Sequence, residues 1–181
     1  MKFTETTIPG VVVVDLEPHQ DERGSFARFL CRDEFAVAAL PAQFAQGSVS
    51  RNFQRGTLRG MHLQLGAAPE EKLVRCTRGR VYDVILDLRK ASRTYLKWTA
   101  VELDGESGRA VFIPAGCAHG YLTLQPDSEL LYLMTVPYDP GHQYGVRWND
   151  PAFAIVWPFE PTLISERDRR FPSYSGLLSR I

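Results

Sequence analysis

The segment Pro114-Ala-Gly-Cys-Ala-His-Gly-Tyr121 follows the apolar stretch Ala110–Ile113 and leads into a second one at residues 120–124. Proline and glycine end strands and permit the tight turns between them, so this pattern predicts strand, turn, strand. Outward from it, we expect further short strands at residues 73–77, 81–88, 97–103 and 129–135, and earlier ones at 11–14 and 26–31. Many short strands separated by turn residues are typical of an all-β sandwich, barrel or jelly roll.

The expected strand at residues 81–88 carries the clearest alternation. One face is apolar, with Tyr82, Val84, Leu86 and Leu88, and the other is mixed, with Val81, Asp83, Ile85 and Asp87. Because successive side chains of a strand point to opposite faces, this pattern predicts one face in a core.

Little helix is expected, and we predict a single domain over residues 1–181. Residues 33–40 form the one early helix, with Asp33 at or near its N-cap and Pro41 closing it. The polar, arginine-rich tail at residues 161–181 is expected to pack as turns or short helices.

Charge and composition exclude several classes of function. The chain has 181 residues, 21 basic and 21 acidic side chains and a formal net charge of zero, which disfavours a nucleic-acid binder. Only four of the basic residues are lysine, so the rest are arginines, which suit bidentate phosphate contacts but also follow from codon preference. The sequence contains no long apolar run, so we expect neither a membrane span nor a signal peptide. Three cysteines without a CxxC pair favour reduced thiols and a cytoplasmic protein.

Two of the four histidines lie in patterned surroundings. His119 lies in Pro-x-Gly-x-x-His, and His62 lies in Thr57-Leu-Arg-Gly-Met-His-Leu-Gln64. These stretches resemble the second and first signatures of the cupins, except that Gln64 stands where a second metal-binding histidine would be. The available ligand set would be His62, Gln64, Glu70 or Glu71, and His119. An amide oxygen replaces imidazole poorly toward Fe, Ni or Zn, so we expect no metal. The alternative for His119 is a buried, hydrogen-bonded structural histidine.

Other side chains are candidates for the same cavity. Arg59 has the opposite strand parity to His62, unless Gly60 introduces a bulge. Lys72 opens a strand, where a solvated edge charge is the ordinary outcome. Tyr132 is expected to face away from Leu131 and Leu133. The alternative is an ordinary half-buried tyrosine of a strand.

The whole chain resembles the dTDP-4-dehydrorhamnose 3,5-epimerases of deoxysugar biosynthesis. Six motifs carry the resemblance in the family's order: Asp21-Glu-Arg-Gly24, Leu58-Arg-Gly-Met-His-Leu-Gln64, Lys72-Leu-Val-Arg-Cys76, Ile113-Pro-Ala-Gly-Cys-Ala-His-Gly120, Arg147-Trp-Asn-Asp150 and Ser165-Glu-Arg-Asp168. The resemblance implies a cupin double-stranded β-helix with short peripheral helices. It also implies a cofactor-free, metal-independent homodimer with exchanged N-terminal strands, acting on a nucleotide-linked 4-keto-6-deoxyhexose.

The resemblance also implies residue roles in proton transfer next to a ketone. His62 is then the base that removes a proton at C3 or C5, and Asp168 orients its ring. Tyr132 returns a proton on the far face, and Lys72 stabilises the enolate oxygen.

Substrate contacts follow from the same resemblance. Arg23 and Arg59 would bind the diphosphate, and Tyr138 would pack against the base. Arg59 and His119 would line the sugar and phosphate side.

The substrate-binding set departs from the family pattern at four places. Arg28 stands where the family has a glutamate, and Gln46-Gly-Ser48 replaces Gln-x-Asn. Gln143 replaces a glutamate, and Arg167 replaces a lysine. A CDP- or GDP-linked sugar therefore stays open beside dTDP, as does epimerisation at C3 or C5 alone.

Two alternatives come from other classes of function. One is a metal-dependent cupin oxygenase or isomerase, which the missing second histidine disfavours. The other is a non-catalytic sugar-nucleotide binder, which the presence of separate candidates for base, acid and oxyanion contact disfavours.

Overall fold

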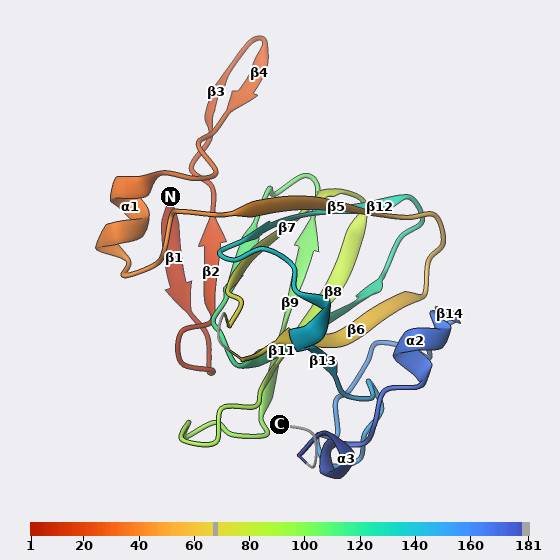
Figure 1. The fold of residues 1–181 in the computed structure, drawn as a ribbon. Helices are drawn as coiled ribbons and strands as arrows, with labels where there is room; N and C mark the ends of the chain where they lie inside the picture. Colours follow the sequence, from red (N-terminus) through yellow and green to blue (C-terminus); the bar gives the residue numbers. More distant parts are fainter. Residues whose placement is uncertain (67–68, 179–181) are drawn as a thin grey trace.

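Two antiparallel sheets, packed face to face, form the body of the computed structural model, which describes residues 1–66 and 69–178 (Figure 1). The first sheet has the strand order β1-β2-β10-β7-β12-β5. Its strands are β1 (Lys2–Glu5), β2 (Val12–Asp15), β5 (Gln46–Asn52), β7 (Lys72–Arg78), β10 (Ala110–Ile113) and β12 (Ser128–Met134).

The second sheet has the order β13-β6-β11-β8-β9, and β14 adds a short parallel pairing to β6. Its strands are β6 (Thr57–Gln64), β8 (Arg80–Asp87), β9 (Trp98–Asp104), β11 (Cys117–Thr123), β13 (Gln143–Gly145) and β14 (Leu163–Ile164). Consecutive strands repeatedly cross between the two sheets, as in a jelly roll, so the predicted all-β cupin barrel is confirmed.

The remaining elements lie outside the two sheets. They are the hairpin β3 (His19–Asp21) and β4 (Gly24–Phe26), the helices α1 (Arg32–Val37), α2 (Glu166–Arg169) and α3 (Tyr174–Leu178), and the 3-10 turn η1 (Pro140–His142). The short helices expected in the tail are confirmed by α2 and α3, whereas residues 179–181 lie outside the described part.

Two sequence predictions near the N-terminus are wrong in detail. The strand expected at residues 26–31 is absent, because Phe26 ends a projecting hairpin whose strands pair only with each other. The predicted helix begins one residue early and ends at Val37, short of residue 40. Its N-cap is Cys31 without a side-chain cap bond, while Asp33 pairs with Arg32.

The main apolar core lies between the sheets and includes Val74, Ile85, Tyr121 and Leu130. Apolar clusters also cover both outer faces. Phe35 of α1 packs on the outside of the first sheet, and the C-terminal tail packs on the outside of the second.

The strand that alternated most clearly is therefore buried on both sides. Its apolar face, including Val84 and Leu86, lies under the C-terminal tail. Its mixed face points into the barrel, which carries Asp83 and Asp87 into the interior. Buried carboxylates need partners, and this requirement decides where the polar network of the interior forms.

Asp87 ties the end of β8 to neighbouring loops. Its carboxylate accepts hydrogen bonds from the Nε and Nη2 of Arg89, at 2.8 and 2.9 Å, and from Thr94 Oγ1 at 2.7 Å. Arg89 Nη2 also donates to the carbonyl of Pro9 at 2.9 Å. Burial alone would raise the pKa of Asp87, but hydrogen bonds led by those from Arg89 lower it to about 2.

We predict that Asp87→Asn lowers the free energy of unfolding at pH 7 by about 2 kcal/mol. The lowered pKa of Asp87 adds stability above about pH 4, and this contribution is lost as the pH falls through about 2. Urea unfolding at pH 7, 5, 4 and 3 measures this, and the gap between wild type and variant should narrow below pH 4. Asp33→Asn, which changes an exposed carboxylate, is the control; a gap independent of pH contradicts the prediction.

Candidate active site

A β-bulge in β6 sets the positions of the first candidate residues. His119 pairs with His62, whereas Tyr121 pairs with Arg59, so β6 has one residue more than β11 between the two pairs. A Cβ on Gly60 would lie 2.6 Å from the Cα of Gly120, which leaves room only for glycine. The bulge that Gly60 was considered able to introduce is present, and it brings Arg59 and His62 onto the same inward face.

His62 and Asp168 form a dyad between β6 and α2. The Nε2 of His62 lies 2.8 Å from Asp168 Oδ1, and Asp168 Oδ2 accepts from the Gly60 N–H at 3.2 Å. Ser165 caps α2 by accepting from the Asp168 N–H at 3.1 Å, which fixes where the carboxylate emerges. Burial would raise the pKa of Asp168, but the hydrogen bond from His62 and its charge lower it overall.

The rim beside His62 is built from the tail and β13. The Phe171 ring meets the His62 ring edge-on at 5.5 Å between centroids, and a Cβ on Gly145 would lie 2.4 Å from Phe171. Arg167 donates to Gln143 Oε1 at 3.3 Å. The structure therefore brings Gln143 and Arg167 together at this rim.

A second histidine–carboxylate pair lies deeper in the same barrel. The Nε2 of His119 is 2.8 Å from Asp83 Oδ2, and both residues are buried. Asp83 Oδ1 is also buried and has no hydrogen-bond partner among the described residues. The alternative of a buried, hydrogen-bonded His119 is thus satisfied structurally, although its ring also lies 6.1 Å from that of Tyr132.

Tyr132 faces these groups from the opposite sheet. It packs against the inner core while Leu133 packs on the outer face, which confirms the predicted orientation. Burial, together with the neighbouring Tyr121 and Asp83, raises the pKa of Tyr132 well above its ordinary value. The phenol therefore keeps its proton at neutral pH.

A hydrogen-bonded chain connects Arg59 to Tyr121. Arg59 Nε donates to Asn52 Oδ1 at 2.9 Å, and the Tyr121 hydroxyl donates to the same oxygen at 3.1 Å. Ser50 Oγ lies 2.8 Å from that hydroxyl. The guanidinium of Arg59 is thereby fixed at one edge while the residue stays exposed.

Lys72 is buried, so the solvated edge charge weighed from its spacing is wrong. Its Nζ lies 2.6 Å from Glu70 Oε2, and both side chains are largely excluded from solvent. Lys72 pairs with Met134 and Val74 pairs with Tyr132, so the lysine shares the inward face of Tyr132. A buried cation with a carboxylate partner is available on the wall opposite His62.

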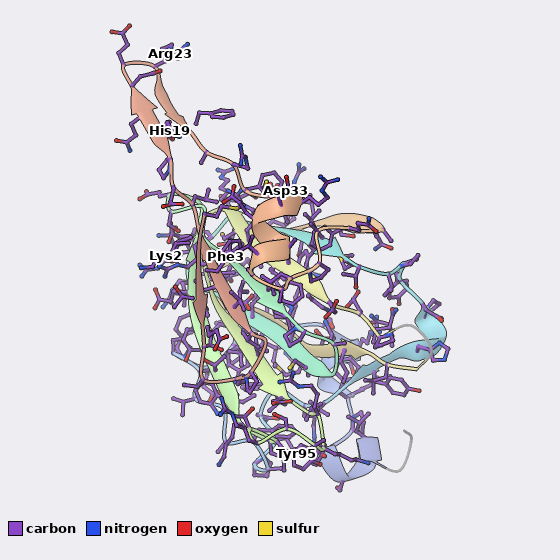
Figure 2. The ribbon with its side chains drawn as sticks, turned by 90° about the vertical axis from the view of Figure 1, so that its left-hand side faces the viewer. Lys2, Phe3, His19, Arg23, Asp33 and Tyr95 are labelled. Atoms are coloured by element: carbon purple, nitrogen blue, oxygen red, sulfur yellow. The ribbon has the colours of Figure 1, made fainter. Side chains whose placement is uncertain are left out.

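The remaining candidates divide between the barrel mouth and the hairpin. Gln46 Nε2 donates to Ser48 Oγ at 3.3 Å, and Gln46 Oε1 accepts from the Tyr138 N–H at 2.9 Å. Arg23 sits at the tip of the β3–β4 hairpin, which projects away from the barrel (Figure 2). Arg28 pairs with Glu34 at 2.7 Å. The structure thus does not bring Arg23 and Arg28 into the cavity of their own chain.

The donor set fits a metal poorly. Each inward histidine is paired with an aspartate, and both atoms of the Gln64 amide contact backbone groups of a loop. Within residues 1–66 and 69–178, no group of three or more His, Cys, Asp or Glu side chains is arranged to hold a metal ion.

Comparison with known proteins decides the family. The family model described as dTDP-4-dehydrorhamnose 3,5-epimerase matches residues 5–175. The chain belongs to this family. It is 39% identical over 178 residues to the dTDP-4-dehydrorhamnose 3,5-epimerase of Sinorhizobium fredii, covering 98% of this chain and 91% of the relative.

Solved structures agree with this assignment. An epimerase of Mycobacterium tuberculosis superposes with a TM-score of 0.94 at 32% identity, covering 99% of this chain and 92% of the other. A 3'-monoepimerase from Streptomyces bikiniensis, solved with dTDP-quinovose, gives a TM-score of 0.89 at 31% identity, covering 97% and 89%.

Neither a membrane-spanning helix nor a reactive thiol is part of the site in the described residues. No helix in the described residues has the length and apolar character needed to cross a bilayer. Cys31, Cys76 and Cys117 are free, and burial raises the pKa of the Cys76 thiol to about 11 and that of Cys117 to about 12.

The partners of three site residues were not assigned from the sequence. They are Asp83 for His119, Asn52 for Arg59 and Glu70 for Lys72. Glu70 was considered only as a carboxylate of a cupin metal set, and the structure places it against Lys72 instead. Asp83 had a signal in its place between apolar residues of a strand, because a buried carboxylate needs a partner. Asn52 carried no local pattern.

Proposed function

We propose that the protein is an epimerase of a nucleotide-linked 4-keto-6-deoxyhexose, with a dTDP sugar as the first candidate. The observation that carries the proposal is the His62–Asp168 dyad on one wall of the barrel, opposite the protonated Tyr132 on the other. A base and an acid on opposite walls can remove a proton from one face of a sugar carbon and return one to the other face.

Asp168 selects the reactive tautomer of His62. A carboxylate with a lowered pKa is ionised at neutral pH and only accepts hydrogen bonds, so the His62 Nε2 must carry the proton. The lone pair is then on Nδ1, which bonds to none of the described residues. The side chain of His62 is 31% exposed, and in the proposed mechanism Nδ1 is the nitrogen that faces the substrate. Asp168 also stabilises the imidazolium that forms when His62 takes the proton.

The ketone at C4 acidifies the neighbouring C–H bonds at C3 and C5. Removal of a proton by His62 moves the electron pair into an enolate with its charge on the C4 oxygen. Lys72 supplies the cation for that oxygen, and Glu70 holds the ammonium in place. Tyr132 then donates its proton to the far face of the carbon, and proton exchange with solvent restores both groups.

Substrate binding uses the mouth of the barrel. Arg59 binds the diphosphate, His119 lines the sugar side, and Tyr138 packs on the base. Gln46, Ser48, Gln143 and Arg167 complete the substrate contacts. The reaction takes place in the cytoplasm, without metal or cofactor.

The hairpin completes the site of a second copy in a homodimer. Arg23 projects from the body, out of reach of its own barrel (Figure 2), and Phe26 of the same hairpin is 78% exposed. In the dimer, Arg23 binds the partner's diphosphate and Arg28 lies near the partner's nucleotide. Mixing inactive Arg23→Ala and His62→Asn proteins should restore about a quarter of the activity, because hybrid dimers contain one intact site. No restoration contradicts exchange between copies.

Deuterium incorporation tests the reaction itself. The wild-type protein should incorporate solvent deuterium at C3, C5 or both in a dTDP-linked 4-keto-6-deoxyhexose, with inversion at each exchanged carbon. The positions labelled separate a 3,5-epimerase from a 3- or 5-monoepimerase. Absence of exchange with dTDP, CDP, GDP and UDP sugars alike would falsify the proposal.

Ligand-induced stabilisation identifies the base. A ligand bound only by the native state raises the free energy of unfolding by about 2.7 kcal/mol at 100 times its Kd. Thermal unfolding with dTDP, CDP, GDP and UDP should give its largest shift with the true nucleotide. We expect dTDP; a larger shift with GDP or CDP reassigns the substrate through Arg28.

A further inference from the structure

Two glutamines from opposite sheets hold three consecutive backbone groups of one loop. Gln64 of β6 donates from Nε2 to the Pro137 carbonyl at 3.2 Å and accepts at Oε1 from the Asp139 N–H at 2.9 Å. Gln46 of β5 accepts from the intervening Tyr138 N–H at 2.9 Å. The amide of Gln64 thus pairs with the loop as a peptide group pairs across a sheet.

Because Gln64 is buried and Tyr138 is exposed, the glutamine determines the position of the loop. Gln64 is only 2% exposed and points inward from β6, whereas Tyr138 is 47% exposed. A buried amide without partners costs more free energy than an exposed one, so the loop is held to the geometry that satisfies Gln64. The backbone of Tyr138 is therefore fixed while its ring stays free to meet a ligand.

We infer that Gln64 and Gln46 are positioning residues for the Tyr138 ring, and that together they set nucleotide affinity. This inference rests on the proposed function, because it takes the Tyr138 ring as the contact for the base. It also gives the position of the missing cupin histidine a purpose of its own. At this position, where a cupin would have a metal-binding histidine, Gln64 instead shapes the substrate-binding loop.

Loop protection is the first test, and it needs no substrate. In Gln46→Met, the Tyr138 amide should exchange with solvent about tenfold faster, and in Gln64→Met the Asp139 amide should do so. Hydrogen-exchange NMR on the full chain measures both, with β8 amides as internal reference. Gln54→Met, at an exposed glutamine, is the matched control and should change neither amide. Unchanged exchange in both glutamine variants overturns the inference.

Nucleotide affinity is the second test. The Kd of dTDP should rise about tenfold in Gln64→Met, which changes no direct substrate contact, while kcat at saturating substrate stays within about twofold. In a Tyr138→Ala background, Gln64→Met should add no further loss, because both changes act through one ring. Additive losses, or faster loop exchange with an unchanged Kd, overturn the inference. Failure of the proposed function is separate, since it would already be seen in the wild-type protein as absent nucleotide binding and absent deuterium incorporation.

Discussion

Replacing His62 with asparagine should lower the rate of deuterium incorporation into the substrate by about 10³-fold, within the range of general-base catalysis. Asparagine keeps a polar side chain beside Asp168 but has no basic nitrogen at neutral pH. Because His62 is partly exposed, the fold should be retained, with an unfolding temperature close to that of the wild type. Mass spectrometry of the sugar in heavy water measures the exchange, and thermal unfolding checks the fold.

His119→Asn is the matched control, because the barrel holds two histidine–aspartate pairs. The His119 side chain is 5% exposed and its ring meets that of Tyr132 edge-on, so we assign it to substrate binding. Its replacement should raise KM more than it lowers the exchange rate at saturation. If His119→Asn abolishes exchange while His62→Asn preserves it, the base is the deeper histidine.

Replacing Tyr132 with phenylalanine should separate exchange from inversion. His62 still removes the proton and exchanges it with solvent, but no acid then stands on the far face. We expect deuterium incorporation to continue while inverted product falls by about 10²-fold or more. NMR of the product, which reports both label position and configuration, measures this uncoupling.

Tyr121→Phe is the control for a lost phenol in the same core. Tyr121 is fully buried and its hydroxyl is hydrogen-bonded to Asn52 and close to Ser50, so this variant should lose stability but keep inversion coupled to exchange. Normal inversion by Tyr132→Phe would contradict the role of Tyr132 and leave water or another side chain as the donor.

The sequence predicts the architecture well because its turn residues and strand patterns are local. The strands around Pro114 and the orientation of Tyr132 away from Leu133 follow from spacing, and Gly60 marked a place where a bulge was possible. The hairpin is predicted poorly. Residues 26–31 have the composition of a strand, but their sequence does not show whether a sheet edge is available for them to pair with. Burial of both faces of β8 was also missed, because a strand cannot show from its own letters that the distant tail covers it.

The candidate site was only partly predictable for the same reason. Individual histidines and Lys72 stand in recognisable motifs. Their partners come from distant parts of the chain or, like Glu70, were considered for another role, and pairings such as Asn52 with Arg59 depend on register. The resemblance supplied Asp168, which spacing alone would not have paired with His62.

The His62–Asp168 hydrogen bond joins residues 106 positions apart, and the aspartate lies in the last part of the chain. Contacts between distant segments form late, since loop closure must precede them. A nascent chain can therefore complete its barrel strands and still hold His62 in no defined tautomer. Catalytic competence arrives only when the C-terminal segment docks, so the return of activity during refolding reports this docking in addition to formation of the sheets.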